Sequence, residues 1–324
     1  MKKTVLVTGS AGFIGFHLSK RLLDMGYGVA GIDNLNEYYD KKLKLARNKI
    51  LTEYPAYNFY QNDICKHNTL LDIITAHRPD IICNLAAQPG VRYSLEAPFV
   101  YGDSNLTGFL SILEAAKNNG IQLVFASSSS IYGENSSESF LEEMRTDSPI
   151  SLYAATKKAN EVMAHSYAHL YKVPMIGLRF FTVYGPWGRP DMALFKFTKK
   201  ILDGDSIDVY NNGEMYRDFT YVDDIVDGIL ETFEYDFPDA NMPYEIFNIG
   251  CGNPRKLMDF VNLIIKYCDK DATLNLLPMQ PGDVLRTSAN IEKAQNLLGF
   301  NPKISMEEGV KNFVEWYREF YYEQ

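Results

Sequence analysis

The chain has 324 residues, of which 46% are hydrophobic and 23% are charged, and it carries a net charge of −9 with an isoelectric point of about 5.2. This acidic balance argues against nucleic acid or an anionic membrane surface as a general partner, and no apolar run approaches the ~18 residues of a membrane span. The four cysteines show no CxxC spacing, so we expect reduced thiols in a cytoplasmic protein and no zinc or other metal site.

The first half of the chain alternates short apolar runs with longer helical patterns. We expect buried strands at 4–8, 28–33, 58–63, 81–87, 123–128 and 175–180. The pattern predicts helices between them at about 12–26, 40–53, 67–77, 98–119 and 152–171. Nearly continuous apolar strands are typical of parallel strands covered on both faces. The alternation therefore predicts an α/β fold, a Rossmann-type doubly wound parallel sheet.

The character of the sequence changes after Phe181, where Gly, Pro and Arg become frequent. We expect a helix at about 191–203, a hairpin-like polar stretch at 208–219 and an amphipathic helix in the aromatic C-terminus. This change predicts two lobes. The first covers 1–180, with 222–250 returning to it, and a smaller C-terminal lobe covers most of 181–324.

A glycine-rich turn links the first strand to the first helix. The stretch "VTGSAGFIG" places Gly9, Gly12 and Gly15 there, and such glycines let the backbone approach a pyrophosphate at the N-terminus of a helix. Asp33 ends the second strand, 18 residues after Gly15, where a carboxylate can accept from the adenosine ribose and repel a 2′-phosphate. A tight turn without a ligand is the alternative. Asp63 and "NLAAQ" (84–88) also follow strands, so four strand ends favour an NAD site.

Tyr153 and Lys157 lie four residues apart in "SLYAATKKANE", so they share one face of the expected helix, for which Ser151 can be the N-cap. The pair Tyr38 and Lys42 has the same spacing, and we expect it to be a solvated surface pair. A free phenol has a pKa near 10, which an ammonium and the positive nicotinamide of NAD would lower. Tyr153 could then take a proton from a substrate hydroxyl while a hydride leaves the same carbon.

The serine run "ASSSSIYG" (126–133) ends the fifth expected strand. One of its hydroxyls can bridge the phenol and the substrate oxygen. A polar turn without a catalytic role is the alternative.

Together, the glycine turn, the serine run and the Tyr–Lys pair resemble the extended short-chain dehydrogenase/reductases. The stretches "AAQPGVRYSLEAP", "LRFFTVYGPWGRPDMALFKF", "RDFTYVDDI" and "MQPGDV" are similar to those of nucleotide-sugar epimerases, in particular UDP-glucuronate 4-epimerases. The resemblance covers essentially the full chain. It implies an NAD-binding first domain, a UDP-sugar-binding second lobe and a homodimer formed by the helices at 98–119 and 152–171.

The motifs and the resemblance together imply the site residues. The catalytic residues are Ser128, Tyr153 and Lys157. NAD contacts are expected at Gly9, Gly12, Phe13, Ile14, Gly15, Asp33, Asn34, Asp63, Ile64, Leu85, Ala86, Ala87, Gln88, Asn105, Ser127, Tyr153, Lys157 and Phe180. UDP-sugar contacts are expected at Arg92, Ser128, Ser129, Thr182, Arg189, Val209, Tyr210, Arg217, Gln280, Asp283 and Arg286. Arg286 is the candidate replacement for an arginine that many such epimerases carry near the position of Gln280. Glu161, His165 and His169 have metal-like spacing, but we interpret them as one face of a helix.

The chemistry of the substrate separates the alternatives. Oxidation at C4 of a glucuronate places a ketone β to the carboxylate, and such acids lose CO₂ readily. Decarboxylases and dehydratases of this superfamily typically carry an acidic residue in the serine motif, which is absent from "SSSSIYG". We therefore expect a C4 epimerase of UDP-glucuronate, with Thr182, the serines and Arg189 holding the carboxylate. The alternatives are a 4-epimerase of UDP-glucose or UDP-N-acetylglucosamine, a UDP-glucuronate decarboxylase and a non-catalytic NAD-binding redox sensor.

Overall fold

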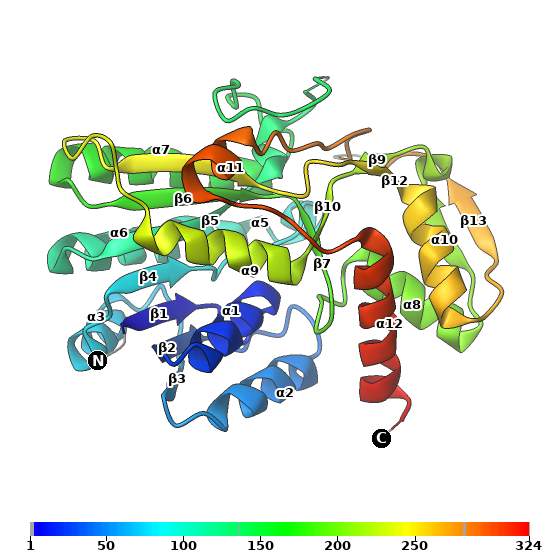
Figure 1. Ribbon diagram of the computed structural model, residues 1–324, viewed down its shortest axis with the longest axis horizontal. Coiled ribbons are helices and arrows are strands. Elements are labelled where there is room, and N and C mark those ends of the chain that lie inside the picture. The colour runs from blue at the N-terminus through cyan, green and yellow to red at the C-terminus, as the bar shows by residue number, and fades with distance from the viewer. Residues whose placement is uncertain (1–2, 136, 281–282, 324) are drawn as a thin grey trace.

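The computed structural model describes residues 3–135, 137–280 and 283–323. Its centre is a seven-stranded sheet in the order β11-β6-β5-β4-β1-β2-β3, in which every pair of neighbours is parallel (Figure 1). The strands are β1 (Thr4–Thr8), β2 (Gly28–Asp33), β3 (Tyr57–Gln61), β4 (Ile81–Asn84), β5 (Gln122–Ser128), β6 (Met175–Phe180) and β11 (Tyr244–Ile249). The predicted fold class is confirmed.

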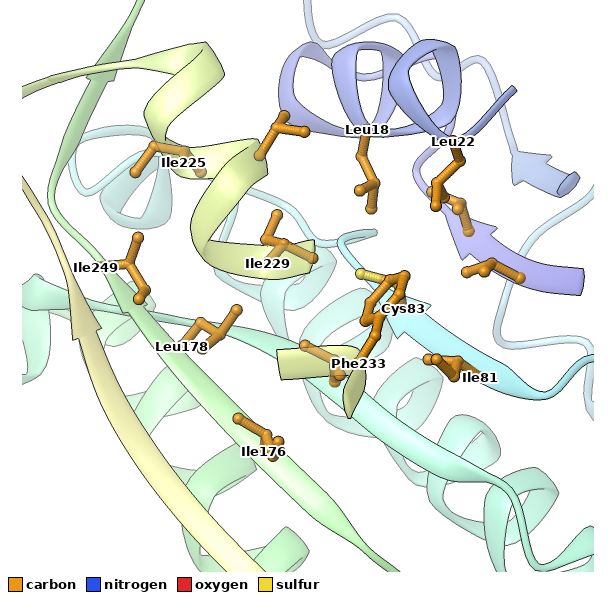
Figure 2. Close-up of a cluster of buried hydrophobic side chains, with 14 of the residues drawn as sticks. Leu18, Leu22, Ile81, Cys83, Ile176, Leu178, Ile225, Ile229, Phe233 and Ile249 are labelled. Carbon is orange, nitrogen blue, oxygen red and sulfur yellow. The ribbon is translucent and has the colours of Figure 1, made fainter. Parts of the chain in front are cut away.

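Helices cover both faces of the sheet, as two separate apolar clusters show. One face packs against α1 (Phe13–Asp24), α2 (Lys41–Thr52), α9 (Val222–Glu231) and α11 (Glu292–Leu298). The other face packs against α3 (His67–His77), α6 (Gly108–Asn119) and α7 (Leu152–Tyr171). Figure 2 shows the first cluster, in which Leu18 and Leu22 of α1 and Ile229 of α9 lie over the sheet together with Ile81 of β4 and Ile176 of β6. Burial on both faces explains the continuous apolar strands.

The second half of the chain adds a smaller lobe beside the sheet (Figure 1). Its helices are α8 (Ala193–Asp203), α10 (Leu257–Cys268) and α12 (Met306–Tyr321). Its core is aromatic: Phe219 and Phe260 stack with ring centroids 4.0 Å apart, and Phe313 and Tyr317 of α12 belong to the same cluster. The amphipathic C-terminal helix therefore packs where we expected it. The division of the chain at residue 180 into two domains stays a prediction.

Short strand pairs lie outside the central sheet. They are β7 (Thr182–Tyr184) with β10 (Phe219–Tyr221), β8 (Ile207–Tyr210) with β13 (Leu274–Leu277), and β9 (Tyr216–Arg217) with β12 (Arg255–Lys256). The hairpin expected at 208–219 is wrong, because β8 and β9 each pair with a distant strand rather than with each other. The remaining short elements are helical: α4 (Tyr93–Glu96), α5 (Pro98–Tyr101) and the turns Ser129–Tyr132, Asn211–Gly213 and Thr232–Glu234.

The helix expected at 98–119 contains a π-helical segment, Gly102–Thr107, between α5 and α6. Asn160 of α7 donates from Nδ2 to the main-chain oxygen of Asn105 at 2.6 Å. The Asn105 side chain in turn bonds the main chain of Gln88 on both its N–H and its oxygen. The distortion thus ties this helix to the loop after β4. Across the described ranges, no helix is long and apolar enough to cross a membrane.

Candidate active site

A cleft of about 760 Å³ lies at the carboxyl ends of the parallel strands and extends to the second lobe. Its lining includes Gly9 after β1, Asp33 at the end of β2, Ala86 after β4 and Ser128 at the end of β5. Ligands of open α/β sheets bind at this edge, and the volume suits a small-molecule site. We call this space the cleft.

The glycine turn forms one wall of the cleft. Gly9 has a positive φ of 70°, and the Gly12 N–H donates to the Gly9 oxygen at 2.8 Å. A Cβ on Gly15 would lie 2.0 Å from that same oxygen, so this position can hold only glycine in this turn. Helix α1 begins here with no side-chain cap, which leaves its first N–H groups for an anion. The turn therefore fits a pyrophosphate.

Asp33 ends β2 beside this turn. Its carboxylate accepts from the N–H groups of Ala11 at 3.2 Å and Leu35 at 2.8 Å. Burial raises the pKa of Asp33, and the charge of Lys44 opposes that shift. Lys44 itself donates from Nζ to Asn36. A carboxylate oriented by two N–H groups at the cleft wall fits a ribose, as expected.

The three candidate catalytic side chains meet where β5 ends and α7 begins. Ser128, Tyr153 and Lys157 all line the cleft. Ser151 caps α7 as expected, because its hydroxyl accepts from the Ala154 N–H at 3.1 Å. The cap places Tyr153 and Lys157 on the first two turns of the helix, facing the same side.

Burial has the largest effect on the pKa values of Tyr153 and Lys157. Burial raises the pKa of the Tyr153 phenol, although a hydrogen bond with Ser128 and the charge of Arg189 oppose the shift. Burial also lowers the pKa of Lys157 to about 8. We expected Lys157 to be the cation acting on the phenol, but the cation that lowers the pKa of Tyr153 here is Arg189. Further positive charge must therefore come with a ligand before the phenol loses its proton at neutral pH.

A buried ion pair between Arg179 and Glu161 contacts the serine run through Ser127. Arg179 of β6 donates from Nε and Nη2 to the two carboxylate oxygens of Glu161 at 2.9 and 3.0 Å. The Ser127 hydroxyl donates to the same carboxylate at 2.6 Å. Arg179 also donates to the Tyr132 hydroxyl at 2.8 Å. Because β5, β6 and α7 are joined in this way, Ser128 at the end of β5 is held in place.

Arg189 lies on the loop that joins β7 to α8. It donates from Nε to Asp191 Oδ1 at 3.0 Å and from Nη2 to Asp191 Oδ2. Tyr38 donates from its hydroxyl to Asp191 Oδ2 at 3.1 Å. The expectation that Tyr38 is a solvated surface residue is wrong: it is partly buried in the cleft, where burial raises its pKa to about 12. Lys42, its partner in spacing, is exposed as expected.

The opposite end of the cleft is rich in arginine. Arg92 Nη2 donates to Asp283 Oδ2 at 3.0 Å, and the Arg92 guanidinium lies 4.8 Å from the centre of the Tyr210 ring. Both residues of this ion pair line the cleft, and it joins the loop after β4 to the C-terminal part of the chain. Burial lowers the pKa of Arg217, and the charge of Asp283 opposes that shift. Two guanidinium groups line this end of the cleft and only Arg92 bonds the carboxylate of Asp283, so this end suits an anionic ligand.

The cleft brings together most of the predicted site residues. Its lining includes the predicted NAD contacts other than Gln88 and Asn105, and the predicted UDP-sugar contacts other than Val209, Gln280 and Arg286. Gln88 and Asn105 are buried and bond each other behind the cleft. Their expected contact with NAD stays a prediction, and their mutual bonds shape the loop after β4.

Three of the predicted UDP-sugar contacts lie outside the lining of the cleft. Val209 is fully buried, because neighbouring residues of β8 alternate in direction and Tyr210 faces the cleft. Arg286 is exposed and lies over the Tyr216 ring at 5.5 Å. Gln280 is partly buried outside the lining. The next two residues of its motif, 281 and 282, fall outside the described residues.

Sequence reasoning missed several residues that line the cleft: Tyr38, Lys44, Asp191 and Lys196. Asp191 is two residues after Arg189, and this Arg-x-Asp spacing on one loop was the available signal for an ion pair. The metal-like spacing in α7 has a structural explanation: Glu161 is bonded to Arg179, and His165 packs edge-on against Tyr244. In the described part of the chain, no cluster of three or more His, Cys, Asp or Glu side chains could hold a metal ion.

The profile of the NAD dependent epimerase/dehydratase family matches residues 5–250. The chain belongs to this family. The expected resemblance, the NAD cofactor and the prediction of an NAD-dependent epimerase are thereby confirmed. The glycine turn, in which a Cβ on Gly15 would clash with the Gly9 oxygen, fits the pyrophosphate of that cofactor.

Individual relatives resemble the chain over its whole length. A probable UDP-glucuronate 4-epimerase of Rhizobium meliloti is 47% identical, over 98% of this chain and 97% of that protein. The structure of a UDP-glucuronic acid 4-epimerase from Bacillus cereus, in complex with UDP-glucuronic acid and NAD, is 34% identical with a TM-score of 0.90. It covers 98% of this chain and 100% of that one. A UDP-glucose 4-epimerase from Thermotoga maritima, solved with UDP-glucose, is 32% identical with a TM-score of 0.86, over 98% and 99% of the chains.

Proposed function

We propose that the protein interconverts UDP-glucuronate and UDP-galacturonate by inverting the configuration at C4 of the sugar. The observation that carries the proposal is that Ser128, Tyr153 and Lys157 line one cleft together with Arg189 and the glycine turn. The names of the relatives from Rhizobium meliloti and Bacillus cereus support the same substrate.

Each catalytic residue has a role that its position supports. Tyr153 takes the proton of the C4 hydroxyl, and Ser128 bonds the phenol and the sugar oxygen. When bound, NAD⁺ supplies a hydride acceptor and a positive charge beside the phenol. Lys157, whose Nζ donates to the Ala126 oxygen at 2.9 Å, holds the end of β5 and adds positive charge when it is protonated. The proton on Tyr153 returns to the oxygen once the 4-keto sugar has turned its other face to the cofactor.

Binding roles follow the two ends of the cleft. Arg92 and Arg217 hold the UDP pyrophosphate, and Tyr210 and Asp283 lie where the uridine enters. Thr182, Ser129 and Arg189 hold the sugar carboxylate. This contact keeps the C–CO₂ bond poorly aligned with the π orbitals of the ketone, an alignment that loss of CO₂ requires. The serine motif carries no acid that could promote elimination. These roles favour return of the hydride over loss of CO₂.

A neutral UDP-hexose is the second candidate substrate, and one observation favours it. The charge of Arg189 is already compensated by Asp191, so the sugar end of the cleft is not strongly cationic. The similarity to a UDP-glucose 4-epimerase agrees with this alternative. Measuring the activity on each substrate distinguishes the two candidate functions, because only the uronate carries a carboxylate that Arg189 can bind.

We also propose a homodimer of cytoplasmic location. Large apolar side chains are exposed along α4, α5, α6 and α7: Leu95 is 67% exposed, Phe99 85%, Leu110 42% and Val162 54%. An apolar surface on adjacent helices is typical of a face that a second copy covers. Light scattering of the purified protein, with Phe99→Glu as the disrupting variant, measures the oligomeric state directly.

The test of the proposed function is a product assay on three substrates: UDP-glucuronate, UDP-glucose and UDP-N-acetylglucosamine. We expect UDP-galacturonate from the first, at a kcat/KM at least about ten-fold above that for the other two. A pentose product with CO₂ release would identify a decarboxylase instead. Activity confined to a neutral hexose would support the second candidate, and unchanged activity of Tyr153→Phe would support a non-catalytic role.

A further inference from the structure

Asp191 occupies an unexpected place for an acid, because it faces the end of the cleft where an acidic sugar is proposed to bind. Its carboxylate is partly buried and bonds the Arg189 guanidinium through two of its nitrogens, Nε and Nη2. Its Oδ2 also accepts from the Tyr38 hydroxyl at 3.1 Å. A two-point pair of this kind fixes both the position and the plane of a guanidinium.

Arg189 needs such support because it lies on a loop with unusual backbone angles. Trp187, two residues earlier, has a φ of 59°, and Gly185 has a φ of 148°. The buried Arg47 holds this part of the loop through the main-chain oxygens of Trp187 and Gly188. Arg47 anchors only the main chain, however, and Asp191 holds the Arg189 side chain itself.

Tyr38 ties the same pair to the cofactor side of the cleft. It follows β2, and its hydroxyl lies so close to Gly90 that a Cβ there would be 2.7 Å away. Its ring packs against Tyr93, with centroids 4.8 Å apart. Tyr38 therefore stays in one position and donates to Asp191 from a fixed direction.

We propose that Asp191 is a positioning residue that fixes the Arg189 guanidinium beside Tyr153 and offsets its charge there. This inference rests on the proposed epimerase function. A free arginine at this point could rotate away from the sugar carboxylate toward C4, where its full charge would stabilise the enolate formed by loss of CO₂. Paired with Asp191, Arg189 presents a hydrogen-bonding edge at a constant distance from the phenol.

The charges around Tyr153 determine the sign of the expected pH effect. Lys157 lies on the same helix, Tyr101 packs edge-on against Tyr153 with centroids 6.2 Å apart, and Arg189 faces it across the cleft. Asp191 and Tyr38 face Arg189 in turn. The charge of Arg189 lowers the pKa of Tyr153 against the effect of burial. Removing the charge of Asp191 lets Arg189 act more strongly, so the phenol loses its proton at lower pH.

The experiment compares Asp191→Asn, Asp191→Glu and Tyr38→Phe with the wild type, with bound NAD. For Asp191→Asn we expect kcat to fall by about ten-fold or more and the acid limb of the kcat–pH profile to move down by about half a pH unit. Asp191→Glu keeps the charge, so its acid limb stays in place and part of kcat returns. Tyr38→Phe loses kcat by only about two- to five-fold, without a pH shift. Asp203→Asn is the matched control, because Asp203 pairs with Lys199 on the surface of the same lobe.

A second readout does not depend on turnover. The phenolate absorbance of NAD-loaded Asp191→Asn, minus that of the same variant with Tyr153→Phe, gives the titration of Tyr153 alone. We expect it at lower pH than the corresponding difference for the wild-type background. An unshifted titration overturns the inference, and so does a loss of kcat in Asp191→Glu as large as that in Asp191→Asn. If the wild type fails to epimerise UDP-glucuronate, the proposed substrate fails, but the titration still tests Asp191.

Discussion

Lys157 donates a hydrogen bond from Nζ to the main-chain oxygen of Ala126, 2.9 Å away, from a position that is only 3% exposed. The bond joins α7 to the end of β5, next to Ser128. The ammonium is therefore part of the structure of the site as well as a source of charge. Because one carbonyl replaces only part of the water that an ammonium loses, burial lowers the pKa of Lys157 to about 8.

The first prediction concerns stability without NAD. Lowering the pKa of Lys157 from 10.5 to about 8 corresponds to about 3 kcal/mol of destabilisation when the group is protonated in both states. Lys157→Met should therefore abolish turnover but raise the free energy of unfolding at pH 7 by about 1–3 kcal/mol.

The pH dependence of that difference follows from the direction of the pKa shift. The unfolded chain binds the additional proton between pH 8 and 10.5, so the stability of the wild type rises with pH over this window. The advantage of Lys157→Met should shrink over the same window and vanish above it. Urea unfolding of both proteins at several pH values measures this, and a less stable variant at pH 7 would contradict it.

A second prediction tests the role of the glycine turn in binding NAD. Gly15→Ala places a Cβ 2.0 Å from the Gly9 oxygen, so the turn must open. We expect loss of bound NAD and destabilisation by about 1–3 kcal/mol or more. Gly102→Ala is the matched control: a Cβ there meets nothing within 4 Å, and its helical backbone accepts alanine. NAD content by absorbance and thermal unfolding should separate the two variants. Equal NAD content in both would refute the role of the turn.

A third prediction concerns the ion pair behind the serine run. Glu161→Leu leaves the Arg179 charge buried without its partner and should cost about 3–5 kcal/mol. The double variant Glu161→Leu with Arg179→Met removes both charges and should be more stable than Glu161→Leu alone. A double-mutant cycle from denaturant unfolding measures the coupling. If the effects of the two substitutions simply add, the pair does not act as a unit.

A fourth prediction separates two arginines that the sequence alone treats alike. Arg217 lines the cleft, whereas Arg286 is exposed outside it. Arg217→Gln should raise KM for the UDP-sugar by about ten-fold or more, since it removes the charge-assisted bonds that we propose Arg217 makes to the pyrophosphate. Arg286→Gln should change KM by less than about three-fold. Steady-state kinetics measures both KM values, and thermal unfolding checks that the variants are folded. A larger increase in KM for Arg286→Gln than for Arg217→Gln would mean that Arg286 moves into the cleft.

The sheet could be predicted from the sequence because its strands are buried on both faces. The expected strands at 4–8, 28–33 and 175–180 match β1, β2 and β6 to the residue. The runs of β1 and β2 are followed by Gly9 and Asn34 and the run of β6 is preceded by Pro174, and such residues are local signals. The hairpin at 208–219 failed because pairing is not local: β13 and β12, which pair with β8 and β9, follow about 65 and 38 residues later in the chain.

The site was predictable where a residue type has a local reason to be there, as in the glycine turn and the capped start of α7. It was not predictable where a side chain's role depends on a distant partner. Tyr38 fits the spacing of a surface pair, and only Asp191, 153 residues away, brings it into the cleft. Gln88 and Asn105 are similar, because only the tertiary structure shows that the Asn105 side chain bonds the Gln88 main chain.

The measurement that tests the central claim most directly follows the hydrogen at C4. We would incubate the protein with UDP-glucuronate carrying deuterium at C4 and analyse the UDP-galacturonate by mass spectrometry. If a hydride leaves and returns to the same carbon while Tyr153 handles only the hydroxyl proton, the product keeps its deuterium, and Tyr153→Phe yields almost no product. Loss of the deuterium to solvent, or an active Tyr153→Phe variant, would contradict the account.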